Sequence, residues 1–127
     1  MITFRKRSTS QPRADRPMTV TAYPRRENKK IVHLQLALSA EILAASGWRQ
    51  GDSVEVDFED GTWTLSRTLN RRSGYTLSRM SGKTHRCGLK ITAATEQLDE
   101  LGLTVKQPRC CVLVEGQADQ RIIVRYE

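Results

Sequence analysis

The chain has 127 residues, of which 38% are hydrophobic and 28% charged, and its formal net charge is +7. This length suits a single domain with one core. No apolar run approaches the roughly eighteen residues that a membrane helix needs, and the basic start MITFRKRSTSQPR has no apolar stretch behind it. We therefore expect a cytoplasmic protein with neither a membrane span nor a secretory signal.

The predicted elements begin after a basic arm. Residues 1–17 are polar and basic and contain two prolines, which is typical of a flexible arm. Residues 18–23, MTVTAY, indicate a short strand, and a polar, basic loop over residues 24–30 follows it. Residues 31–38, IVHLQLAL, alternate between strongly and weakly apolar positions. This alternation predicts a strand with one buried face.

A short helix over residues 40–46 is expected next. Ser39 has the side chain of an N-cap residue, and Gly47 suits the left-handed conformation that ends a helix. Residues 49–67 then form a predicted hairpin, with Asp60-Gly61 as its tight turn.

A basic joiner, residues 68–88, leads into a second unit over residues 89–127. We expect Thr95 to cap a second short helix and Gly102 to end it. A strand around Cys110 to Val114 and a final strand over residues 121–126 complete this unit.

The two units repeat one pattern at a constant separation in sequence. This separation, the one between Leu34 and Leu89, is called the repeat offset below. Residues 34–61 and 89–116 match at Leu34/Leu89, Leu36/Ile91, Glu41/Glu96, Leu43/Leu98, Gly47/Gly102 and Gly61/Gly116. A repeated unit of this size usually cannot bury its apolar face alone, so the two copies should share one core. We predict a mainly β fold with two short helices (α+β). It comprises the arm 1–17 and a single domain over 18–127, divided into repeat one (31–67), the joiner (68–88) and repeat two (89–127).

Three cysteines, an odd number, do not make a disulfide framework. Cys110 and Cys111 are adjacent on a predicted strand, so we expect one to pack in the core and the other to face outward. His85 and Cys87 do not have the spacing of a zinc site. We therefore expect no metal and no cofactor.

The stretches RPMTV (16–20), HLQLALSAEILAASGW (33–48) and GDSVEVDFEDGTWTLSR (51–67) together resemble the SpoVT–AbrB superfamily, most strongly its SymE-like proteins. The resemblance covers residues 16–67 well and residues 89–126 weakly. It implies a swapped-hairpin β-barrel, which a chain with two copies closes alone, as in the two-repeat MraZ-like regulators. It also implies a bacterial or phage protein that binds DNA or RNA, either as a transcription regulator or as a SymE-like toxin of the toxin–antitoxin kind.

Positive charge is concentrated in two parts of the sequence. Residues 1–30 and residues 61–95 each carry a net charge of +7, and the second stretch contains no acidic residue. Concentrated positive charge favours a polyanion, and arginine matches phosphate geometry, so we predict a nucleic-acid partner. Tyr75 is a candidate for stacking on an exposed base, although packing within a hairpin explains it more simply. The expected backbone contacts are Arg5, Lys6, Arg7, Arg13, Arg16, Arg25, Arg26, Lys29, Lys30, Arg67, Arg71, Arg72, Arg79, Lys83 and Arg86.

Two other functions stay open at this point. The basic segments can instead bind an acidic protein surface, such as that of a polymerase, a nuclease or a ribonucleoprotein complex, and inhibit it. The acids Glu55, Asp57, Glu59 and Asp60 suit a small metal-dependent nuclease toxin, although a solvated strand face explains their alternation more simply. His33 is expected at the edge of the core. The sequence has no catalytic signature, so we predict a non-enzymatic protein that acts as a monomer or homodimer.

Overall fold

A computed structural model describes residues 17–79, 87–114 and 121–127. Strands make up most of the described residues, and the helices are short, as predicted. None of the helices in this part of the chain is both long and apolar enough to cross a membrane. The elements are β1 (Met18–Pro24), β2 (Ile31–Leu38), α1 (Ala40–Ser46), β3 (Ser53–Glu59), β4 (Thr62–Thr68), β5 (Tyr75–Thr76), β6 (Ser78–Arg79), β7 (Cys87–Ala94), the 3-10 helix η2 (Thr95–Gln97), α2 (Leu98–Leu101), β8 (Arg109–Leu113) and β9 (Arg121–Tyr126).

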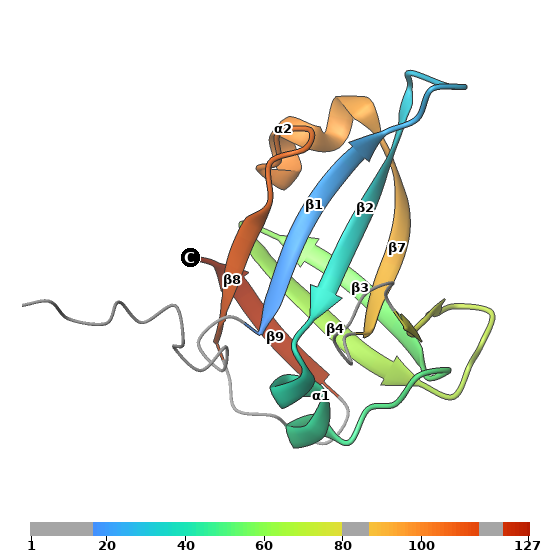
Figure 1. Cartoon of the computed structure of the whole chain (residues 1–127), viewed down its shortest axis with the longest axis vertical. Helices are drawn as coiled ribbons and strands as arrows, with labels where there is room; N and C mark the ends of the chain where they lie inside the picture. The colour runs from blue at the N-terminus through green and yellow to red at the C-terminus, as the bar shows by residue number, and fades with distance from the viewer. Residues whose placement is uncertain (1–16, 80–86, 115–120) are drawn as a thin grey trace, which may run out of the picture.

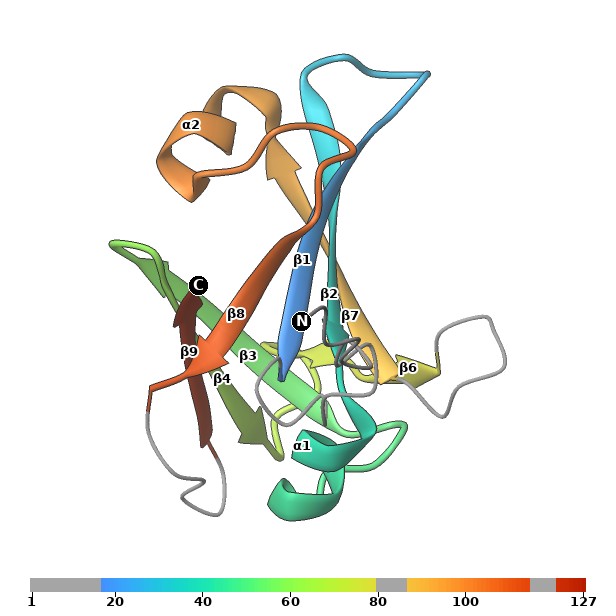
Figure 2. The same ribbon diagram turned by 60° about the vertical axis from the view of Figure 1, so that its left-hand side comes forward.

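The strands form one antiparallel sheet in the order β5-β3-β4-β9-β8-β1-β2-β7-β6. Its two ends meet, because only Leu77 separates β5, which pairs with β3, from β6, which pairs with β7. Leu77 is fully buried. Its carbonyl oxygen accepts a hydrogen bond from Gly51 N, and its amide donates one to Asp52 O, both at 2.8 Å. The sheet is therefore nearly closed into a barrel. Helices α1 and α2 lie at its opposite ends (Figures 1 and 2).

The core lies inside this barrel. Strand β2 alternates between partly exposed and buried positions, with Val32, Leu34, Leu36 and Leu38 all buried. This confirms the predicted single buried face. Full burial of such a side chain stabilises the fold by about 1.5–3 kcal/mol, so the inner face of β2 is a large part of what holds the barrel together.

The local predictions for the first unit are confirmed. Helix α1 spans the predicted residues, and Ser39 Oγ accepts a hydrogen bond from Ile42 N at 3.2 Å. Gly47 follows the helix with a φ of 70°. The β3–β4 turn holds Asp60 and Gly61 at φ values of 47° and 75°, as a two-residue hairpin turn of this twist requires.

The second unit differs from its prediction in one capping residue and in the joiner. The prediction that Thr95 caps the second helix is wrong, because Thr95 Oγ1 donates instead to Lys29 O at 2.7 Å. The side chain that bonds the start of η2 is Gln97, whose Oε1 accepts from Ala94 N at 3.1 Å. The segment predicted as a joiner supplies β5 and β6 to the barrel wall.

The adjacent cysteines do occupy different environments. Cys111 is fully buried, whereas Cys110 is half-buried. Burial raises the pKa of the Cys111 thiol from 9.0 to about 12, and the nearby Cys110 adds a smaller upward contribution. Cys111 is therefore a packing residue that stays protonated at neutral pH.

Positions related by the repeat offset occupy matching places in the sheet. Strands β2 and β7 pair with Gln35 opposite Lys90, which is its counterpart in the second unit. Strands β1 and β8 place Val20 opposite Arg109. By the repeat offset, Val20 corresponds to Tyr75 and Arg109 corresponds to Val54. These two counterparts also lie opposite each other, on β5 and β3. The correspondence thus includes β1 and β5, which precede the residues matched in the sequence.

Candidate nucleic-acid interface

The turn between β1 and β2 carries four of the predicted phosphate-binding side chains. These strands pair along their whole length, from Met18 opposite Leu38 to Pro24 opposite Val32, so the turn is held at the end of a regular hairpin. Its residues 25–30 are all exposed. They project at the end of the barrel where α2 lies (Figure 1). The four cations gathered there, beside the single acid Glu27, are Arg25, Arg26, Lys29 and Lys30.

The conformation of this turn is supported on two sides. Within the turn, Asn28 Oδ1 accepts a hydrogen bond from Lys30 N at 2.9 Å. From η2, Thr95 donates its hydroxyl to Lys29 O at 2.7 Å and its amide to Lys30 O at 2.8 Å. Only backbone atoms of the lysines take part in these bonds, so both ammonium groups remain available to a ligand. A turn fixed in this way loses less conformational entropy when it binds.

The wall formed by β1, β2 and β7 contains no acidic residue. Its outward positions form rows across the three strands, because residues opposite each other in antiparallel strands point to the same side of the sheet. The central row is Thr21, Gln35 and Lys90, and the row next to the basic turn is Tyr23, His33 and Thr92. This surface offers hydroxyl, amide, imidazole and ammonium groups beside the four cations of the turn.

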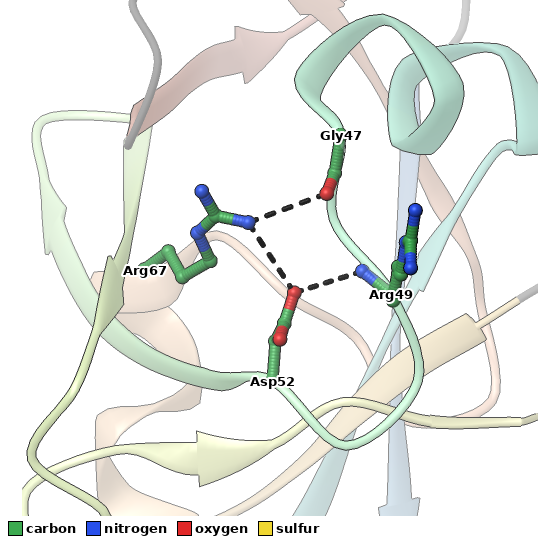
Figure 3. A network of polar contacts seen from close by, with 4 residues as sticks. All are labelled: Gly47, Arg49, Asp52 and Arg67. Carbon is green, nitrogen blue, oxygen red and sulfur yellow. Dashed lines mark hydrogen bonds and ion pairs between the residues drawn. The ribbon is translucent and has the colours of Figure 1, made fainter.

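Arg67 is used inside the fold. Its guanidinium Nη1 donates to Gly47 O at 3.2 Å and lies 3.6 Å from Asp52 Oδ2 (Figure 3). The same carboxylate oxygen accepts the backbone amide of Arg49 at 2.8 Å. The network joins the end of α1, the loop before β3 and the end of β4. Arg67 was predicted to contact a phosphate, and its charge is already opposed by that of Asp52.

Arg71 and Arg72 lie in an exposed turn that leaves β4 at the α1 end. Asn70 Oδ1 accepts a hydrogen bond from Arg72 N at 3.1 Å, and Ser73 Oγ donates to Glu55 Oε1 at 2.7 Å. Beside the two arginines, Leu69 is fully exposed. The turn therefore presents a small basic and apolar surface.

The structure does not bring all the described basic residues into one patch. The turn of Arg71 and Arg72 lies near α1, whereas residues 25–30 lie at the α2 end of β2. Strand β2, whose eight residues span about 27 Å at about 3.4 Å per residue, runs from the α2 end of the barrel to the α1 end. Arg79 is exposed on β6, and Tyr75 is 39% exposed on β5. The predicted contacts Arg5, Lys6, Arg7, Arg13, Arg16, Lys83 and Arg86 lie outside the described residues.

The carboxylates predicted as an alternative metal site lie along β3. Asp57 and Glu59 are exposed, and they lie opposite Thr64 and Thr62 of β4. In the part of the chain that the structure describes, no three acidic, histidine or cysteine side chains come together in a group that could hold a metal ion. His33 lies half-buried on the outer face of β2.

Sequence reasoning did not identify a second arginine network, at the α2 end. Arg109 Nη1 donates to Gly102 O at 2.9 Å, and its guanidinium lies 3.8 Å from the centre of the Tyr126 ring. The Tyr126 hydroxyl donates to Leu101 O, and burial raises the pKa of this tyrosine. The repeat relates Gly102 to Gly47 but does not relate Arg109 to Arg67, so the sequence indicates a matching helix end and not the arginine that bonds it.

A comparison of the chain with protein-family models, with curated proteins and with solved structures returned no match.

Proposed function

We propose that the protein binds nucleic acid through the acid-free wall of β1, β2 and β7 and the basic turn at its end. The observation that carries this proposal is the separation of charge. Four cations adjoin three strands without a carboxylate, whereas the exposed acids Asp57 and Glu59 lie on β3, which pairs with none of the three strands. A polyanion approaching the first surface meets attraction from the turn and hydrogen-bonding groups along the strands.

The length of the wall suggests the length of the ligand. Strand β2 is about 27 Å long, which corresponds to about eight base pairs at about 3.4 Å per pair. We infer that a ligand of this length spans the wall, with Arg79 near one end. Oligonucleotides of increasing length should gain affinity up to about this size and little beyond it.

The proposed fold is the swapped-hairpin barrel of the SpoVT–AbrB superfamily, closed within one chain. The matching registers of positions related by the repeat offset support this proposal, as does the sequence resemblance over residues 16–67. On this view the protein acts without catalysis, as a cytoplasmic regulator of transcription or as a SymE-like blocker of nucleic-acid processes.

The first experiment measures binding to single-stranded DNA, duplex DNA and RNA by fluorescence anisotropy at several salt concentrations. If about five phosphates are neutralised, the logarithm of the binding constant should fall with the logarithm of salt concentration with a slope of about 4 to 5. An affinity that does not depend on salt would contradict the proposal. Capture of one stoichiometric protein partner after nuclease treatment would favour an inhibitor of an acidic protein surface instead.

The second experiment locates the contact. The variant Arg25→Ala/Arg26→Ala should lower the salt slope by about 2, because each lost phosphate contact removes about one unit. The matched control is Arg121→Ala/Arg125→Ala on β9, which removes the same charge from exposed positions on another wall. Equal effects of the two double variants would show that net charge, rather than this surface, determines binding.

A further inference from the structure

The barrel wall is incomplete between β3 and β7. Strand β6 pairs with β7 only at Ser78 opposite Gly88 and Arg79 opposite Cys87. Strand β5 pairs with β3 only at residues 53 and 54. Both β3 and β7 continue beyond these pairs, to Glu59 and Ala94, and over the described residues no strand lies between their facing edges.

The matching place elsewhere in the sheet is filled. Strand β1 pairs with β2 over all seven of its residues and with β8 at residues 18–20. The register correspondence relates β1 to the segment Ser73–Arg79, which pairs with β3 only at Tyr75 and Thr76 and with β7 only at Ser78 and Arg79. The strand is therefore complete in the first half of the chain, as β1, and only partly formed in the second half, as β5 and β6.

A cleft of about 270 Å³ opens at this incomplete wall. Most of the residues that line it are apolar, and they include residues from both unpaired edges as well as the core residues Leu34 and Trp63. Its other apolar lining comes chiefly from Val56, Phe58, Ile91 and Leu101. The volume suits one large apolar side chain together with its backbone, and the strand edges on either side offer unused hydrogen-bonding groups.

The charged residue in the lining of the cleft is an acid, and the neighbouring residues on η2 and β3 include further acids. Among the lining residues the charged one is Glu100, which is exposed on α2. Glu96 is exposed one turn earlier, and Asp57 and Glu59 are exposed on β3 beside the lining residue Phe58. A segment that combines apolar residues with basic ones would match both the lining and the surroundings of the cleft.

We propose that the cleft receives residues 2–7 of this same chain as an added strand, with Phe4 in the apolar pocket. The segment reads ITFRKR, so Ile2 and Phe4 alternate as the apolar positions of a strand require, and three cations follow. Residues 5–16 connect Phe4 to Pro17 and can span up to about 40 Å when extended, which is longer than the eight-residue strand β2. The segment thus has the length, the alternation and the charge that the cleft requires.

The test uses the two tryptophans as internal reporters. Trp63 lines the cleft and Trp48 does not, so their indole N–H signals in a two-dimensional NMR spectrum distinguish local occupancy from a global change. In the full chain without nucleic acid, Phe4→Ala should shift the Trp63 signal and leave the Trp48 signal in place. A synthetic peptide of residues 1–8, added to the Phe4→Ala protein, should return the Trp63 signal towards its original position in a saturable way.

Charge reversal provides the second measurement. Glu100→Lys should weaken binding of this peptide to the Phe4→Ala protein by about threefold to tenfold. Its control, Glu41→Lys, changes another exposed acid, on α1, and should leave peptide binding unchanged. Identical Trp63 signals in the original and Phe4→Ala proteins would overturn the proposal. A Trp63 shift that depends on protein concentration would also overturn it, by showing that a second copy supplies the segment.

Discussion

The two halves of the chain share a backbone plan but support it with different side chains. At the end of α1, the Gly47 carbonyl accepts a hydrogen bond from Arg67, which also pairs with Asp52. At the end of α2, the carbonyl of Gly102, the counterpart of Gly47, accepts one from Arg109, which lies over the ring of Tyr126.

The first network is polar and partly exposed, with Arg67 and Asp52 side chains 29% and 30% accessible. The second is built on a half-buried aromatic ring. The same structural need, a partner for the carbonyl at a helix end, is thus met by arginines from different strands. Backbone correspondence between the halves does not predict which side chain supplies the hydrogen bond, and variants at corresponding positions can measure the difference.

The largest expected difference lies at positions 22 and 77, which correspond in register. The first half has Ala22, and the second has the fully buried Leu77, which lies at the closure of the barrel. Leu77→Ala should lower the free energy of unfolding by about 2–4 kcal/mol, because it leaves a cavity where the sheet ends meet. Urea unfolding measures this loss. The control Leu69→Ala removes a fully exposed leucine and should change stability by less than about 0.5 kcal/mol. A loss at Leu77 no larger than at Leu69 would contradict the closure described above.

A second difference is expected at Val56 and Cys111, which are also related by the repeat offset. The pKa of Cys111 is about 12 in the fold and 9.0 in an ordinary thiol, so over this range the folded protein keeps a proton that the unfolded chain loses. The free energy of unfolding is therefore intact below about pH 9 and falls as the pH rises toward 12, by at most about 1.4 kcal/mol per pH unit.

Cys111→Val, which copies the residue of the first half, should remove this part of the pH dependence. Urea unfolding at pH 8, 9.5 and 10.5 in both proteins measures it. Some loss above pH 10 should remain, because burial also raises the pKa of Tyr126 and its contribution has the same sign. Parallel stability curves for the two proteins would show that the Cys111 thiol does not titrate differently in the folded and unfolded states.

The smallest difference is expected between Gly47 and Gly102. Both have a φ near 70°, so an alanine at either place should cost about 1 kcal/mol of backbone strain. A Cβ at Gly102 would also lie 2.9 Å from Arg109 Nη1, whereas at Gly47 it would meet no atom within 4 Å. Gly102→Ala should therefore cost about 2 kcal/mol and Gly47→Ala about 1 kcal/mol in thermal or urea unfolding. Equal losses would indicate that Arg109 moves aside freely.

Several elements could be predicted because their causes are local. Strand β2 follows from alternation over eight residues, α1 from Ser39 and Gly47 at its two ends, and the β3–β4 turn from the conformations that Asp60 and Gly61 adopt readily. The concentration of positive charge in the sequence likewise predicted that residues 25–30 form a basic surface, because a turn with this many charged side chains stays exposed to solvent.

Two side chains whose contacts differ from the sequence-based expectation, Thr95 and Arg67, bond residues that are distant in the chain. Thr95 was expected to cap its own helix, yet its hydroxyl bonds a carbonyl 66 positions earlier in the chain. Arg67 was grouped with phosphate-binding arginines, yet the fold brings Gly47 and Asp52 to it.

The amino-acid sequence by itself determined the short-range elements and the segregation of charge along the chain, since both depend on neighbouring residues. Only the tertiary structure decided that residues 75–79 close the barrel, that the basic turns at residues 25–30 and at Arg71 and Arg72 lie towards opposite ends of the barrel, and that a cleft remains between β3 and β7. The reason is that strand pairing joins residues far apart in the chain, and the register that brings them together is selected by the burial of the whole sheet.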